Sequence, residues 1–317
     1  MKRTQALSMR KRWGLVVLAL IAASPAVTSS AVQLLAFHVG RGPEAIAFDG
    51  TNIWVANQFD DSITKLSVNE GRVSQTVHVG QRPVALAFDG ANLWVANLLS
   101  NTVTLVRPDD GTIAGTVAVG SGPGGLAFDG ASMWVANRES NTVTKVRASD
   151  GTVLGTFKVG ARPIGVAARD GSVWVTNQAS DTVTRLRISD GALLGTFRVG
   201  DGPFGVALDG SSVWVTNFFG RTVTRLRAID GGVQGTSAVG DGPSGVVVSA
   251  GNVWVANNGS STVTVLRQTD GASLATIPVG SGPFGIAVSL TLPAGVGVWV
   301  ASFGSDSVAL IDPRQIQ

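Results

Sequence analysis

Asn52-Ile53-Trp54-Val55-Ala56-Asn57 is the stretch that decides the fold, because it occurs in seven variants along the chain. Its tryptophan returns every forty residues and once more after a five-residue insertion, as Trp54, Trp94, Trp134, Trp174, Trp214, Trp254 and Trp299. A Val-Gly pair with a proline three residues later keeps the same spacing, from Val39-Gly40 to Val279-Gly280. Self-similarity at a fixed period of this length indicates a repeat architecture.

The second unit shows what each repeat contains. Strand-like runs cover residues 83–88, 93–96, 102–107 and 113–119, and turn residues separate them. We expect the Asp89-Gly90 and Asp110-Gly111 pairs to form type I′ hairpin turns rather than calcium loops, because no set of alternating acidic ligands accompanies them. Four antiparallel strands per unit make one blade of a β-propeller. The sequence therefore predicts an all-β, seven-bladed β-propeller of four-stranded antiparallel blades.

The two ends of the repeat region predict how the ring closes. Only one strand-like run, residues 307–311, follows Trp299, so the seventh unit lacks its fourth strand. Residues 32–39 form a spare run that matches the fourth strand of the other units. We expect this N-terminal strand to complete the last blade, which leaves no free sheet edge. Residues 32–317 are thus predicted to form a single domain, with repeats of about 40 residues from residue 40.

Residues 1–31 have the composition of a signal peptide. Five cations and no acidic residue lie there, and an apolar run over residues 13–23 is followed by small residues around Ala26 and Ala31. The run is well short of the roughly 20 residues that span a bilayer. We expect cleavage after Ala26 or Ala31 and a mature chain with no transmembrane anchor. The predicted location is extracytoplasmic, either secreted or periplasmic.

The net charge depends on this N-terminal segment. Without its five cations the formal charge changes from +3 to −2. A mildly acidic mature chain argues against nucleic acid as a partner. The absence of cysteine excludes disulfides and thiolate metal sites.

The repeat resembles a known family. Trp-Val-Thr-Asn at residues 174–177 and 214–217, with Trp-Val-Ala-Asn in other units, is similar to the signature of YVTN-repeat (YncE-like) propellers, although tryptophan replaces the signature's tyrosine. The resemblance covers the whole mature chain and implies an exported protein of bacterial type. A more distant resemblance, in repeat length and Gly-Pro pattern, is to virginiamycin B lyases. Their activity relies on a histidine general base with acidic and metal-binding partners near the axis.

Internal symmetry separates structural residues from candidate functional ones. A residue present in every unit serves the blade, so we assign the tryptophans to the core and expect Asn57 and its equivalents to cap loops through bonds to the backbone. The two histidines, His38 and His78, share one fourth-strand position that Lys158 and Arg198 occupy elsewhere. They offer neither a catalytic triad nor a metal site. We therefore expect no catalytic residue, no metal and no cofactor.

The units differ most in the loops that meet around one mouth of the channel, which we call the top face. Large apolar residues in exposed loops mark an interaction site. We expect one group on blades 7, 1 and 2, a second on blade 5, and arginines between them; the alternative is that the aromatic residues fold inward and plug the channel. The predicted ligand-binding residues are Arg41, Glu44, Phe59, Arg82, Leu98, Leu99, Arg138, Arg162, Phe204, Phe218, Phe219, Arg221, Phe284 and Phe303.

These observations favour an exported, monomeric, non-enzymatic propeller. Its predicted partner is a protein, peptide or glycan bound through the top-face loops. Two alternatives stay open: a propeller enzyme, such as a virginiamycin B lyase-like streptogramin lyase or a hydrolase, and a structural protein of the surface or envelope. An enzyme should show perturbed acids and bases at the axis, whereas a structural protein should self-associate.

Overall fold

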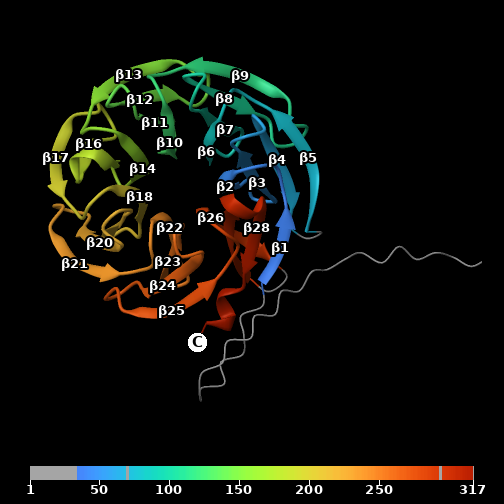
Figure 1. Ribbon diagram of the computed structural model, residues 1–317. Helices are drawn as coiled ribbons and strands as arrows, with labels where there is room; N and C mark the ends of the chain where they lie inside the picture. Colours follow the sequence, from blue (N-terminus) through green and yellow to red (C-terminus); the bar gives the residue numbers. More distant parts are fainter. Residues whose placement is uncertain (1–33, 69–70, 293–294, 317) are drawn as a thin grey trace, which may run out of the picture.

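Seven antiparallel sheets of four strands surround a central axis in the computed structural model, which describes residues 34–68, 71–292 and 295–316 (Figure 1). The predicted fold class is confirmed. Blades 1 to 6 follow the chain in order, from β2–β5 to β22–β25, and blade 7 combines β26–β28 with β1. The predicted signal peptide lies outside the described residues.

Each blade runs from the axis outward in the order of its strands. The innermost strands are β2 (Pro43–Phe48), β6 (Pro83–Phe88), β10 (Pro123–Phe128), β14 (Pro163–Arg169), β18 (Pro203–Leu208), β22 (Pro243–Ser249) and β26 (Pro283–Leu292). The second strands are β3 (Asn52–Asn57), β7 (Leu93–Asn97), β11 (Ser132–Asn137), β15 (Ser172–Asn177), β19 (Ser212–Asn217), β23 (Asn252–Asn257) and β27 (Gly295–Ser302).

The two remaining strands of each blade lie toward the circumference. The third strands are β4 (Ser62–Ser67), β8 (Thr102–Val106), β12 (Thr142–Arg147), β16 (Thr182–Arg187), β20 (Thr222–Arg227), β24 (Thr262–Arg267) and β28 (Ser307–Ile311). The outermost are β5 (Arg72–His78), β9 (Ile113–Ala118), β13 (Val153–Lys158), β17 (Leu193–Arg198), β21 (Val233–Ala238), β25 (Ser273–Pro278) and β1 (Leu34–His38). Short 3₁₀ turns occur at η1 (Gln178–Ser180), η2 (Phe303–Ser305) and η3 (Pro313–Gln315).

The N-terminal strand closes the ring, as predicted. Strand β1 pairs antiparallel with β28, from Leu34 opposite Ile311 to His38 opposite Ser307, so the first and last strands of the described chain lie side by side (Figure 1). The ring of Phe37 also packs on Trp299, with 5.8 Å between the ring centroids. The described part of the closing strand is Leu34–His38, within the predicted 32–39.

The repeated tryptophans form the core between blades. All seven are at most 1% exposed, and each packs on the following blade, as Trp54 does on Leu93 and Val95. Trp299 of blade 7 contacts blade 1 in the same way, so the apolar contacts run around the whole ring. Because both faces of a blade are covered by neighbours, its inner strands are apolar at nearly every position.

Apart from Asp170-Gly171, whose φ angles of +49° and +76° agree with the prediction, the Asp-Gly pairs differ from type I′ turns, which need positive φ at both residues. At Asp89-Gly90 only the glycine has a positive φ, of 95°. The Asp89 carboxylate instead accepts bonds from the amides of Ala91 and Asn92 and from Trp94 Nε1, the last at 2.6 Å. Among the described hairpins between first and second strands, only those of blades 4 and 6 have two consecutive residues with positive φ. The aspartate therefore orients the core indole.

The repeated asparagines also bind differently from the prediction. Asn97 Nδ2 donates to the hydroxyls of Thr102 and Thr104, at 3.2 and 2.9 Å, rather than to backbone groups. The same two bonds form in blades 1 to 6, with Ser62 in place of the first threonine in blade 1. The asparagine ends the second strand of its blade, and the hydroxyl groups that it binds lie on the third strand. It therefore links these two strands.

Candidate functional site

The top end of the axial channel is where the seven blades differ. The first residue after each strand-initial proline lines the channel there, and together these residues form a ring: Glu44, Val84, Gly124, Ile164, Phe204, Ser244 and Phe284. A β-bulge follows the proline in every innermost strand, so that the ladder register shifts at this residue. Bulges redirect side chains. The cavity that this ring lines has a volume of about 190 Å³.

Small residues below this ring let the blades approach closely. A β-carbon at Gly245 would lie 2.5 Å from the carbonyl oxygen of Phe284, and one at Gly285 would lie 2.6 Å from that of Glu44. Thr216 Oγ1 bridges blades 5 and 6 by donating to the carbonyl of Ser244, at 2.7 Å. The ring is therefore held by backbone packing, and its side chains are free to differ.

The side of the mouth formed by blades 1 to 3 is polar. Glu44 is only 5% exposed although it carries a carboxyl group. The side chain of Arg138, from the loop between β11 and β12, reaches into the channel. It lies across Gly124, where a β-carbon would be 3.0 Å from its Cδ and Cζ. A side chain at residue 124 would occupy the same space, so this glycine makes room for the guanidinium.

Burial perturbs the protonation of this pair. It raises the pKa of Glu44 to about 7, although the positive charges of Arg138 and Arg82 counteract the rise. Burial also lowers the pKa of Arg138, and the Glu44 charge opposes that effect. Arg82 and Arg162 disfavour its charged form further, since like charges repel. Strong perturbation of groups that line a cavity is typical of functional sites.

Four polar atoms of top-face residues are buried without a hydrogen-bond partner, two of them in Glu44 and Arg138, which line the cavity. They are Glu44 Oε2, Gln58 Oε1, Arg82 Nε and Arg138 Nε. The remaining buried orphans of the described chain are the Oδ1 atoms of the repeated asparagines and the equivalent Ser302 Oγ, which recur around the ring. An unpaired buried polar atom costs about 1–3 kcal/mol, so the non-repeating set indicates a place where a polar ligand or water binds.

Arg82 and Arg162 add backbone strain at the same end of the channel. Their φ angles are +57° and +53°, whereas the other five blades place glycine there with φ between +62° and +65°. A residue with a β-carbon loses about 1–2 kcal/mol of stability when its backbone adopts this left-handed conformation. Two blades thus keep a strained arginine where glycine is favoured, and strain of this kind clusters at functional sites.

The side formed by blades 5, 7 and 1 is aromatic. Six phenylalanine rings contact one another in series, with centroid distances from 5.2 to 6.5 Å, in the order Phe219, Phe218, Phe204, Phe284, Phe303 and Phe59. The two predicted aromatic groups are therefore one. Phe204 and Phe284 meet edge to face because blade 6 places the small, buried Ser244 between them.

The structure shows where these apolar side chains point. Phe204 and Phe284 turn inward, line the channel and are half-buried. Phe59, Leu99 and Phe219 lie outside it with exposed fractions of 55%, 59% and 61%. Leu98, Phe218 and Phe303 are half-buried. The aromatic residues therefore narrow the channel and also extend onto the surface.

Two of the predicted arginines lie away from the polar cluster. Arg41 forms an ion pair with Asp60, with its Nε 2.6 Å from Oδ1, and Arg221 pairs with Asp241 at 3.2 Å. Both side chains are more than two-thirds exposed, and exposed pairs of this kind contribute little stability. They belong to the rim of the top face rather than to the cavity.

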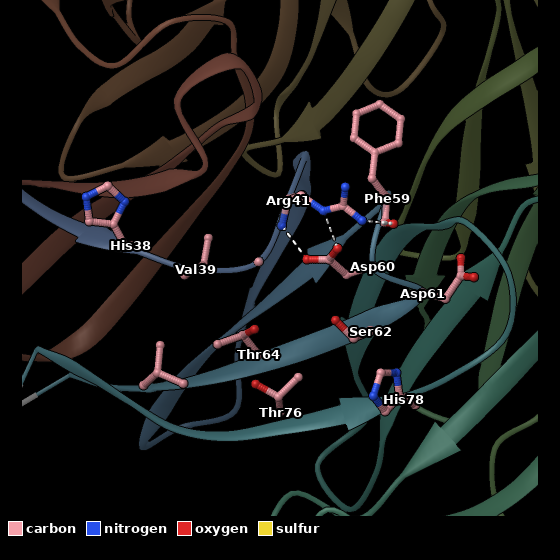
Figure 2. Close-up of a pocket in the computed structure, with 12 residues that line it drawn as sticks. His38, Val39, Arg41, Phe59, Asp60, Asp61, Ser62, Thr64, Thr76 and His78 are labelled. Carbon is pink, nitrogen blue, oxygen red and sulfur yellow. Dashed lines mark hydrogen bonds and ion pairs between the residues drawn. The ribbon is translucent and has the colours of Figure 1, made fainter.

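A larger groove lies on the outside, between blades 7 and 1, with a volume of about 580 Å³ (Figure 2). His38 and His78 come from different outermost strands, at the two sides of this groove, while Arg41 turns back onto Asp60 (Figure 2). A comparable groove of about 500 Å³ lies between blades 2 and 3. Because such grooves recur, we attribute them to the blade architecture. Over the described residues, no three His, Asp or Glu side chains are grouped to hold a metal ion.

Comparison with known proteins gives the fold. No family model and no curated protein sequence matches the chain. A streptogramin B lyase structure covers 90% of this chain and 99% of its own, with a TM-score of 0.77 and 16% identity. Hydrazine synthase of Kuenenia stuttgartiensis covers 90% of this chain and 99% of its own, with a TM-score of 0.76 and 19% identity. The WD40 repeats of RRP9 cover 89% of this chain and 98% of their own, with a TM-score of 0.78 and 14% identity. The likeness is one of fold. The YVTN-repeat resemblance stays a prediction.

Differences between units predicted Glu44, Arg138, Phe204 and Phe284 of the cavity. They missed Gly124 of the cavity and the buried Gln58 of a top-face loop. Gln58 directly follows the repeated Asn57, in a loop already noted as variable, so its position carried a signal. Gly124 gave none, because a glycine that accommodates Arg138 cannot be told from a turn glycine in sequence.

In the described part of the chain no helix has the length and apolar character of a membrane span.

Proposed function

We propose that the protein is an exported, non-enzymatic propeller that binds a protein, peptide or glycan at the top-face mouth. The observation that carries the proposal is the asymmetry of that mouth. Buried, unpartnered polar atoms face a continuous series of phenylalanine rings there. None of these features is repeated in all seven blades, so the fold does not require them.

Affinity capture with the mature chain tests this proposal. The bait is incubated with the envelope fraction of the source cells, and a variant carrying Phe59→Ser, Leu99→Ser and Phe219→Ser is compared with it. We expect the variant to lose its partner and to keep its melting temperature, since all three side chains are exposed.

A matched variant controls for loss of apolar surface. Ile229, Leu193 and Val233 are equally exposed at the opposite end of the blades, so their replacement by serine should leave capture intact. Equal capture by the top-face variant would overturn the proposal. Self-association of the wild-type chain with no captured partner would instead favour an envelope structural protein.

One observation favours a second candidate, an enzyme. Glu44 is a buried carboxyl group with a pKa of about 7, in a cavity that Arg138 also lines. Such a group has the properties of a general base. Because a streptogramin B lyase has the same fold, streptogramin B is the first compound to assay, with the mass of the product as readout. Turnover by the wild type and none by Glu44→Gln would support catalysis; intact streptogramin with both would remove this candidate.

A further inference from the structure

We infer that the mouth recognises a carboxylate group attached to an aromatic or aliphatic side chain, with the carboxylate between Arg82 and Arg138 and the apolar group against the phenylalanine rings of blades 5 and 7. This inference rests on the proposed function and specifies its ligand.

The charge of the polar side favours an anion. Three arginines act on this part of the channel against the buried Glu44 and the exposed Glu139. The Nε atoms of Arg82 and Arg138 are both buried and unpartnered. In a guanidinium, Nε and one terminal nitrogen form a planar pair of donors that matches the two oxygens of a carboxylate. A cationic ligand would meet repulsion from the same groups.

Glu44 complements a carboxylate ligand when the Glu44 side chain itself is protonated and neutral. Its Oε2 lacks a partner, and burial raises its pKa to about 7 against the effect of Arg138 and Arg82. A protonated carboxyl group donates a hydrogen bond, so it acts as a third donor toward a bound carboxylate. When ionised it competes with the ligand for the arginines. Binding should therefore be linked to proton uptake at Glu44.

Polar and apolar character meet within one ring of side chains. Glu44 and Phe284 occupy equivalent positions on the neighbouring blades 1 and 7, and Phe204 packs on Phe284. Glu44, on which the charges of both arginines act, is thus the ring neighbour of an aromatic residue. A ligand that carries a carboxylate and an apolar group a few carbons apart, such as the last residue of a peptide, matches this juxtaposition.

The cavity has room for one apolar group. Its volume is about 190 Å³, and a cavity of about 150 Å³ accommodates a benzene ring. One aromatic or branched aliphatic side chain therefore fits. The exposed Phe59, Leu99 and Phe219 lie beyond the mouth, where they would contact the residues that precede a peptide's C-terminus.

Calorimetric titration at pH 6 tests the inference with defined compounds. N-acetylphenylalanine and a pentapeptide of four alanines ending in phenylalanine are each compared with their C-terminal amides, and phenyl phosphate is included. We expect the free acids to bind at least about tenfold more tightly than the amides, since a hydrogen bond to a charged group contributes this much or more. Tighter binding of the pentapeptide than of the amino acid would identify a chain end as the ligand, and equal binding a small carboxylic acid.

Three variants locate the site. Arg138→Lys, which loses the planar donor pair, and Gly124→Ala, which displaces the guanidinium, should each weaken binding of the free acids by about tenfold or more. Arg187→Ala, at an exposed ion pair on the opposite end, should leave it unchanged. Affinity of the wild type should fall as the pH rises through 7, and Glu44→Gln should remove that dependence.

Several results would overturn the inference. These are equal binding of acid and amide, tighter binding of phenyl phosphate, no effect of Arg138→Lys, and no binding of any compound. If affinity capture still depends on the exposed top-face residues in those cases, the proposed function stands without a carboxylate ligand. If capture is also independent of them, both fail.

Discussion

Replacement of Arg82 by glycine should separate the binding role of this residue from its effect on stability. The backbone φ of Arg82, +57°, lies in the left-handed region. For a residue with a β-carbon this conformation costs about 1–2 kcal/mol of stability. Glycine removes that cost but loses about 0.5–1 kcal/mol more conformational entropy on folding. The net effect is a gain of about 0.5–1 kcal/mol in the free energy of unfolding. Glycine also removes the buried, unpartnered Nε of Arg82, which stabilises the fold further.

The blades themselves indicate that glycine is compatible with this position. The amide of Arg82 donates to Asp61 Oδ1 at 2.8 Å, and the amide of Gly202 makes the same bond to Asp181 in blade 5, at 2.9 Å. The carbonyl of residue 82 also accepts from the Leu98 amide, as that of Gly202 does from Phe218. Arg82→Gly therefore preserves the backbone bonds of the loop.

Urea denaturation and the titration with N-acetylphenylalanine measure the two effects. We expect Arg82→Gly to raise the denaturation midpoint with an unchanged slope, and to weaken binding of the free acid. Ala250→Gly is the matched control: Ala250 has a φ of +52° in a turn at the opposite end of the blade, so it should gain similar stability and bind normally. A lower midpoint for Arg82→Gly with a higher one for Ala250→Gly would refute the reasoning, because Arg82 would then stabilise the fold.

Three further outcomes are expected. A chain that begins at Gly40 lacks β1 and exposes an edge of blade 7, so it should melt at a lower temperature or oligomerise in size-exclusion chromatography; unchanged behaviour would contradict the closure argument. Because the folded-state pKa of Glu44 is raised to about 7, wild type and Glu44→Gln should have equal stability below about pH 4.5. Between pH 4.5 and about 7 the wild type should become progressively less stable than the variant, and above that the difference should level off at about 3 kcal/mol in urea titrations. Secreted protein should have the intact mass of a chain that starts at Val27 or Val32, and a retained Met1 would exclude cleavage.

The repeat determined the fold from sequence alone. A tryptophan at a fixed period, with four strand-like runs in each unit, leaves few architectures other than a ring of blades. The missing fourth strand of the last unit and the spare N-terminal run then specified the closure. These features are local in sequence and are repeated seven times, so an irregularity in one unit did not obscure the pattern.

Details of the turns depended on contacts that the sequence pattern does not reveal. Asp89-Gly90 has the composition of a type I′ turn, but the buried Trp94 needs an acceptor for its indole nitrogen, and the aspartate provides it. The repeated asparagines bind threonine hydroxyls of the next strand for a similar reason. Buried donors are nearly always paired, and which partner they take is decided by packing.

The candidate site shows the same division. Sequence differences between units selected Glu44, Arg82, Arg138 and the phenylalanines, because a residue that only one blade contains does not serve the blade. Only the tertiary structure placed Glu44 and Arg138 at one cavity, since they lie on different blades and Gly124 must be small for Arg138 to reach the axis. Burial then perturbs their charges. Sequence specifies which residues differ, whereas the folded ring determines their neighbours and their exclusion from water.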